Sequence, residues 1–229
     1  MSRLHHHPFC PQSRFIRLAC AEAGLAIELV EERVWERRTE FLALNPAATV
    51  PVLVEEAFAI PGAGVIAEYL DETRGLALGD RRLLPDSVAG RIEVRRLLDW
   101  FNLTFAQEVS EPLVREKIYK RQMGAAHGGG APDAGAIRAA RNNVRYHLRY
   151  VGHLIGRRKW LAGDRMSYAD LVAAAHLSCV DYLGDAPWSE DEAAKEWYAR
   201  IKSRPSFRPL LAEKILGTPA APHYADLDF

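Results

Sequence analysis

The sequence lacks an excess of either charge, a long apolar run and any recognisable cysteine pattern. Its 30 basic and 30 acidic residues cancel, so no overall field attracts nucleic acid or anionic lipid. No stretch reaches the roughly eighteen consecutive apolar residues of a membrane span. Three cysteines, Cys10, Cys20 and Cys179, show no metal-ligand or disulfide spacing, and their odd number suits a reducing compartment. We therefore expect no nucleic-acid partner, no membrane insertion and no metal.

The first residues also lack the apolar segment of a secretory signal, which favours a cytoplasmic location. What the chain does have is 229 residues with 48% hydrophobic composition. This is enough to bury the core of one large domain or two modest ones.

Hydrophobic periodicity divides the chain into two domains and a tail. Residues 1–78 alternate between strands and helices: we predict strands at 3–7, 26–31, 52–55 and 58–60, and helices at 13–24, 36–44 and 64–73. Glycine and proline mark a linker at 75–86. Residues 86–218 form an all-helical domain, with helices predicted at 87–113, 134–156, 168–183, 190–202 and 207–216. Residues 219–229 are the C-terminal tail.

The most informative motif is Cys10-Pro11-Gln12-Ser13, which follows the first predicted strand and opens the first helix. First-turn amides of a helix are unpaired and positively polarised, so we expect a lowered pKa for the Cys10 thiol. This is the C-x-x-[CS] layout of thioredoxin-like folds. Cys10 and Ser13 are the candidate catalytic residues. Retention of Cys10 only as a small buried packing residue is an equally good interpretation.

A second motif narrows the range of thioredoxin-like proteins that the first motif indicates. Residues 44–53 read L-N-P-A-A-T-V-P-V-L, with Val50-Pro51 directly before a predicted strand, where proline stands at the strand start or in cis. With C-P-x-S before it and I-A-E-Y-L at 66–70 after it, the chain resembles the glutathione S-transferase family over nearly its whole length. The resemblance implies an α/β thioredoxin-like N-terminal domain and an all-α C-terminal domain.

The resemblance also implies a glutathione site. Val50 and Pro51 would hold the cysteinyl part of glutathione, and a Glu/Gln-Ser pair at the start of the third helix would hold its γ-glutamyl end. In this sequence that pair falls on Gly62 and Ala63, which supply neither side chain. Each unsatisfied buried group costs on the order of 1 to 3 kcal/mol. We expect a vestigial site that holds no cofactor, or glutathione only weakly through helix-terminus amides.

The helical domain carries a one-sided excess of positive charge along a predicted helix face, with further basic residues before the glycine tract at 128–130. The residues are Lys117, Lys120, Arg121, Arg138, Arg141, Arg145 and Arg149. A solvated face is the usual interpretation of scattered charge. On a neutral chain, however, such an excess favours contact with an acidic partner surface.

The tail contains aromatic and acidic residues that disordered tails usually lack. Its candidate partner-binding residues are Tyr224, Asp226, Leu227, Asp228 and Phe229. Two interpretations are equally good: the tail packs on its own domain, or it docks on a partner.

Five segments narrow the resemblance: H-H-P-F-C-P at 6–11, W-E-R-R at 35–38, Y-A-D at 168–170, D-Y-L-G-D at 181–185 and H-Y-A-D-L-D-F at 223–229. Together they resemble glutathione-transferase-like division proteins of alphaproteobacteria, which bind the tubulin-like polymer FtsZ. The resemblance implies a non-enzymatic, homodimeric regulator of FtsZ filament architecture, located in the cytoplasm at the division site. The rival hypotheses are a glutathione-dependent transferase or thiol reductase that uses Cys10 or Ser13, and a scaffold for another acidic protein.

Overall fold

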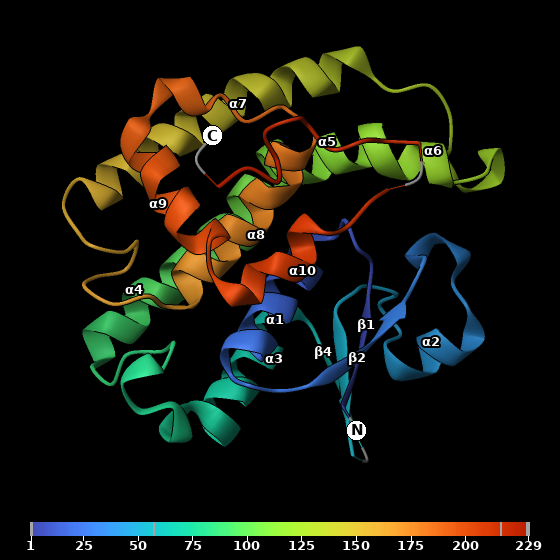
Figure 1. The fold of residues 1–229 in the computed structure, drawn as a ribbon. Helices are drawn as coiled ribbons and strands as arrows, with labels where there is room; N and C mark the ends of the chain where they lie inside the picture. The colour runs from blue at the N-terminus through green and yellow to red at the C-terminus, as the bar shows by residue number, and fades with distance from the viewer. Residues whose placement is uncertain (1, 57, 216, 228–229) are drawn as a thin grey trace.

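The computed structural model describes residues 2–56, 58–215 and 217–227. A four-stranded sheet with its helices forms the N-terminal domain, and helices alone form the rest (Figure 1). The predicted fold class is therefore confirmed. Within the described residues, no helix combines the length and apolarity needed to cross a bilayer.

The N-terminal domain is a βαβ unit followed by a hairpin and a helix. Its elements are β1 (Ser2–His6), α1 (Pro11–Glu22), β2 (Ile27–Glu31), η1 (Val34–Glu36), α2 (Thr39–Leu44), β3 (Val52–Glu55), β4 (Phe58–Pro61) and α3 (Ala63–Leu70), then the turns η2 (Asp71–Gly75) and η3 (Leu76–Arg81). β1 is parallel to β2 and antiparallel to β3, and β3 pairs antiparallel with β4, so the sheet order is β2-β1-β3-β4.

Local chemistry explains both ends of α1. Cys10 is the N-cap, and Pro11, which has no amide hydrogen to leave unpaired, occupies the first turn. Gly24 follows the helix with φ of 69°, a left-handed conformation that favours glycine. The stop predicted at Gly24 is confirmed. The Val50-Pro51 peptide bond is cis, one of the two geometries expected for this motif.

The helical domain begins with one long helix, built from α4 (Val88–Asp99), η4 (Trp100–Ser110), α5 (Glu111–Val114), η5 (Arg115–Tyr119) and α6 (Lys120–Gln122). η4 and η5 are wide, π-type turns. This helix is longer than the one predicted at 87–113. The elements that follow are η6 (Ala125–His127), α7 (Ala134–Ile155), α8 (Tyr168–Tyr182), η7 (Trp188–Glu190), α9 (Glu192–Lys202), η8 (Pro205–Phe207) and α10 (Arg208–Leu211).

The last predicted helix, 207–216, is wrong in extent. α10 ends at Leu211, because the chain then turns so that Glu213 reaches two arginines of α1. Residue 216 lies outside the described residues. A capping box begins α8, with the Ser167 amide donating to Asp170 Oδ2 at 2.9 Å and the Ala169 amide to Ser167 Oγ at 3.2 Å.

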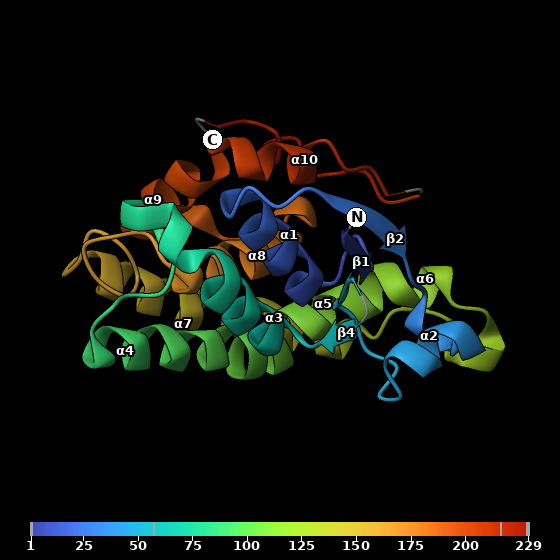
Figure 2. The same ribbon diagram turned by 90° about the horizontal axis from the view of Figure 1, so that it is seen from below.

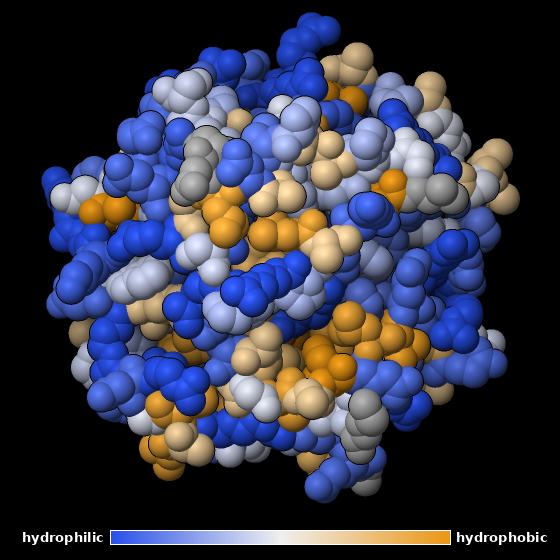
Figure 3. Space-filling view, viewed as in Figure 1, coloured by the Kyte–Doolittle hydropathy of each residue, from blue (hydrophilic) through white to orange (hydrophobic). Residues whose placement is uncertain are grey.

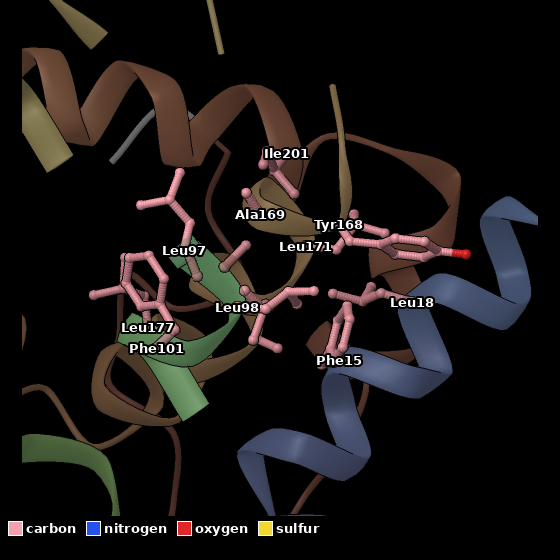
Figure 4. Packing of buried hydrophobic residues seen from close by; sticks show 14 of the residues in the cluster. Phe15, Leu18, Leu97, Leu98, Phe101, Tyr168, Ala169, Leu171, Leu177 and Ile201 are labelled. Atoms are coloured by element: carbon pink, nitrogen blue, oxygen red, sulfur yellow. The ribbon is translucent and has the colours of Figure 1, made fainter. Parts of the chain in front are cut away.

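The two domains share one hydrophobic core. α1 and α8 form the middle layer, with α10 and the C-terminal segment on one side and α4 and α7 on the other (Figure 2). Phe15 and Leu18 of α1 point toward side chains of the helical domain, among them Leu98 and Tyr168 (Figure 4). α8 is buried along its whole length. The linker therefore joins two domains whose apolar faces are packed together.

The tail packs on its own domain where the structure describes it. The Ala221 amide donates to the Tyr182 carbonyl at 2.8 Å, and Tyr224 is only 1% exposed, with its ring 5.0 Å from that of Tyr182. Tyr224, a candidate partner-binding residue, is thus a core residue. Asp226 and Leu227 are exposed. Asp228 and Phe229 lie outside the described residues.

Candidate functional site

A cavity of about 600 Å³ lies between the two domains. One wall is the start of α1 with the segment before β3, which contribute Cys10 and Val50. The opposite wall is the long helix from Gln107 to Tyr119. The cavity thus lies where the family's site was expected, with Cys10 at its edge.

Cys10 is held at the N-terminus of α1. Its Sγ accepts a hydrogen bond from the Ser13 amide at 3.4 Å and lies 3.7 Å from the Val50 carbonyl oxygen, to which the thiol donates. Burial raises the pKa of the Cys10 thiol, although the Ser13 and Gln12 groups act in the opposite direction. The lowered pKa predicted from the helix terminus is therefore wrong, because desolvation of the thiolate outweighs the helix amides.

Ser13, the other catalytic candidate, is fully buried. It does not contribute to the cavity wall, whereas Cys10, Pro11 and Gln12 do. A substrate in the cavity would therefore meet the thiol and not the hydroxyl.

Apart from Cys10, the expected glutathione site has the backbone of the cis-proline loop but lacks the side chains that would bind the glutamyl group. Val50 lines the cavity, and the Gly62 amide donates to the Pro51 carbonyl at 3.0 Å. Neither Gly62 nor Ala63 lines the cavity. Gly62 has φ of 91°, a conformation in which a side chain would be strained. The chain thus holds the cis-proline loop in place while lacking the side chains that would bind a glutamyl group.

Two titratable groups that line the cavity, Glu111 and His176, are poor partners for a thiolate. Burial raises the pKa of Glu111 and lowers that of His176 to about 3. The His176 ring is fixed between Ser110 Oγ, 2.8 Å from Nδ1, and Asn102 Oδ1, 3.3 Å from Nε2. At neutral pH this imidazole is uncharged, so it does not stabilise an anion at Cys10.

The most highly connected polar residue near the site, Arg14, was given no role by the sequence. It is fully buried on α1, where Nε donates to the Pro8 carbonyl at 2.8 Å and Nη1 donates to Ser178 Oγ at 2.8 Å. Arg14 also donates to the Tyr224 hydroxyl at 3.3 Å and to Glu213 Oε2 at 3.2 Å. One guanidinium therefore links α1, α8 and the C-terminal segment.

The structure brings four of the basic candidates around two carboxylates. Asp185 is 2.5 Å from Lys117 and 2.7 Å from Arg141. Glu190 is 2.7 Å from Arg145 and 4.0 Å from Arg149. These side chains are partly neutralised within the chain, so the face is less available than its sequence indicates.

The remaining basic candidates lie apart from that group. Lys120 pairs with Glu116 at 2.5 Å, and Arg121 donates to the Gly217 carbonyl at 3.3 Å. Arg138 is exposed, and no ion pair of its side chain is present in the described part of the chain. Spacing along the sequence placed the arginines on one face but gave no sign of the carboxylates from the segment after α8.

The chain belongs to the glutathione S-transferase family. Models of the glutathione S-transferase N-terminal and C-terminal domains match residues 4–78 and 98–205. The thioredoxin-like sheet, the cis-proline loop and the helical domain described above are the parts that these matches cover.

Particular relatives are similar over the full length. FtsZ-localized protein A of Caulobacter vibrioides (strain NA1000 / CB15N) is 46% identical over 230 residues, which are 99% of this chain and 97% of that protein. The solved structure of FzlA from C. crescentus has a TM-score of 0.92 at 45% identity, covering 100% of this chain and 99% of that one. A glutathione S-transferase from Sinorhizobium meliloti 1021 has a TM-score of 0.98 at 54% identity, with both chains covered at 100%.

Proposed function

We propose that this protein is a non-enzymatic member of the glutathione S-transferase family that binds FtsZ filaments and regulates their architecture during cell division. The observation that carries the proposal is the 46% identity to FtsZ-localized protein A over 99% of this chain. The protein would act in the cytoplasm at the division site. The exposed candidates for contact with FtsZ are Arg138, Arg145, Arg149, Asp226 and Leu227.

The cavity supports the non-enzymatic part of the proposal. Burial raises the pKa of Cys10, so the thiol is mostly protonated at neutral pH, and Gly62 and Ala63 offer no side chain to a glutamyl group. Glutathione would find the cis-proline loop without its other contacts. We propose that no glutathione is bound under cellular conditions.

An apolar stripe supports the homodimer. Val65 of α3, Val88 and Ile92 of α4 and Leu103 of η4 are each more than half exposed, at 59%, 75%, 61% and 55%. Further apolar atoms gather over η3, at the lower left of Figure 3. Large exposed apolar patches mark interfaces, so we propose that this stripe meets the same stripe of a second copy. Ile92→Glu should then give monomers in analytical ultracentrifugation, and Tyr146→Glu on α7 should not.

Two experiments test the proposed function. In the first, the protein is pelleted with polymerised FtsZ. In the second, it is titrated with glutathione in a calorimeter. We expect pelleting with polymer, none with unpolymerised FtsZ under the same spin, and no heat from glutathione. Micromolar glutathione binding with turnover of a generic electrophile, and no pelleting, would support the transferase alternative. In that case Cys10→Ala should abolish turnover if the thiol takes part.

A further inference from the structure

A smaller pocket of about 170 Å³ opens between α7 and the turn that follows α8. Arg141 and Arg145 form one wall, and residues 184–187 form the other. The turn depends on Gly184, whose φ is 70°, and a Cβ placed there would lie 3.4 Å from Ala221 of the tail. A pocket of this size, lined by two arginines and a turn, suits one charged side-chain terminus.

The surroundings of this pocket carry more positive than negative charge. The basic residues are Lys117, Arg141, Arg145 and Arg149, and the acidic residues are Asp185 and Glu190. The whole chain has no net charge, so this is a local excess. An anion entering the pocket would be attracted by the two arginine side chains of one wall.

Asp185 fixes the geometry of this cluster from inside. Its side chain is fully buried, and it accepts from Lys117 on one oxygen and from Nε of Arg141 on the other, which also lies 2.7 Å from Nη2 of Arg141. The guanidinium is thereby held by one edge, and its remaining nitrogen, Nη1, has no partner among the described residues and can bind a ligand. An arginine held in this way loses little conformational freedom when it binds a carboxylate.

Glu190 has a different position, because it is bound to exposed arginines. It contacts Arg145 at 2.7 Å, and the side chain of Arg145 is 52% exposed. Its second oxygen lies 4.0 Å from Arg149, which is 70% exposed. Exposed pairs of this kind are weak, so a carboxylate from another molecule can replace Glu190 on Arg145 at little cost.

The geometry points to this pocket as the receptor for an acidic side chain of the partner polypeptide, seated between Arg141 and Arg145. Asp185 is a positioning residue, and Glu190 is an internal competitor for the same arginine. This inference rests on the proposed function for the identity of the partner, since it specifies how FtsZ would be held. The chemistry of the pocket alone calls for a segment rich in Asp or Glu.

The first experiment uses fluorescence anisotropy with a labelled glutamate-rich peptide, and the same peptide with glutamine in place of each glutamate as control. We expect the protein to bind only the acidic peptide, more weakly as salt is raised. Arg141→Gln with Arg145→Gln should weaken binding about tenfold. Arg33→Gln with Arg208→Gln makes the same charge change at exposed sites elsewhere and should have little effect. Equal losses in both pairs would overturn the inference.

Two single variants separate binding from folding. Arg145→Gln removes only a surface pair, so it should leave the melting temperature unchanged while weakening peptide binding about threefold. Glu190→Gln should tighten binding about threefold, because it releases Arg145. Weaker or unchanged binding in Glu190→Gln contradicts the role given to that residue and overturns the pocket assignment.

Pelleting with polymerised FtsZ then distinguishes the two proposals. If the unmodified protein pellets with FtsZ and the Arg141 and Arg145 pair of changes leaves pelleting intact, the pocket assignment is wrong and the proposed function stands. If the unmodified protein binds the acidic peptide through these arginines and does not pellet with FtsZ, the pocket stands and the proposed function is wrong. If anionic vesicles bind the protein as strongly as the acidic peptide does, the ligand is lipid and not an acidic polypeptide.

Discussion

The N-terminus of α1 and the buried face of α1 differ in how many hydrogen-bond partners their polar groups have. At its N-terminus, α1 presents Cys10 to an open cavity whose expected ligand contacts at Gly62 and Ala63 are missing. On its buried face, Arg14 has oxygen partners on Pro8, Ser178, Glu213 and Tyr224. The polar groups on the buried face of α1 therefore join the N-terminal domain to α8 and the C-terminal segment.

The largest expected effect tests the buried face of α1. Arg14→Met keeps much of the side-chain volume and removes every hydrogen bond of the guanidinium. We expect the free energy of unfolding to fall by about 3 to 5 kcal/mol, because the buried groups around it lose their donor. Urea denaturation measures this, with Arg138→Met as an exposed control that should change stability by about 0.5 kcal/mol or less.

A smaller loss in Arg14→Met would weaken the comparison. A value near that of the Arg138→Met control would show that water or neighbouring groups take over the partners of Arg14. The polar contacts on the buried face of α1 would then contribute no more to the free energy of unfolding than those at the cavity end.

The next effect tests the tail side of the same network. Tyr224→Ala removes a ring that is 1% exposed, so we expect a loss of about 3 kcal/mol in the free energy of unfolding. Tyr224→Phe keeps the ring and should cost only about 1 kcal/mol, from the hydroxyl contacts with Arg14 and the Leu210 carbonyl. Deleting residues 224–229 should therefore destabilise the fold. A truncated chain with unchanged melting temperature would contradict the core role of Tyr224.

A third effect lies between the two regions, at His7. Burial lowers the pKa of His7 from its ordinary 6.5 to about 4, while Nδ1 accepts from the Phe9 amide and the ring packs on Tyr119 of the cavity wall. The unfolded chain takes up the proton more readily, so stability is full above pH 6.5 and falls as pH drops toward 4. Between pH 7 and 5 this residue should account for about 2 kcal/mol of lost stability.

His7→Gln tests that assignment, because glutamine can accept from the Phe9 amide and donate to Gln122 without titrating. The variant should show a drop in unfolding free energy between pH 7 and 5 that is about 2 kcal/mol smaller than that of the unmodified protein. An identical pH dependence in both proteins would mean that the folded protein binds a proton at His7 as readily as the unfolded chain does.

The smallest effect tests the cavity end. Because burial raises the pKa of Cys10, iodoacetamide should alkylate the folded protein more slowly at pH 7.5 than it alkylates a free cysteine, and the rate should rise with pH. Cys10→Ser should remove nearly all labelling, since Cys20 and Cys179 are fully buried. Labelling of Cys10 faster than that of free cysteine would restore the reactive thiol and with it the transferase alternative.

Features set by local residues were predictable, and features set by distant partners were not. Cys10-Pro11 and Gly24 signal their own geometry, so the βαβ unit followed from the sequence, whereas Val50-Pro51 left two geometries open and the structure has the cis one. Nothing in the helical pattern separates Arg14 from a solvated arginine, because its partners lie as far as 210 residues away. The same reason hid the pairing of Arg141 with Asp185, 44 residues further on.

The link between Arg14 and Tyr224 has a consequence for synthesis of the chain. The ribosome makes α1 early and Tyr224 210 residues later, and domains begin to fold from the N-terminus during translation. Until the late segment emerges, the guanidinium of Arg14 lacks Glu213 and Tyr224, and the face of α8 that Tyr224 covers is open. A nascent chain that stalls before Tyr224 leaves this face of α8 exposed, so the contacts of Arg14 are complete only after the ribosome has made Glu213 and Tyr224.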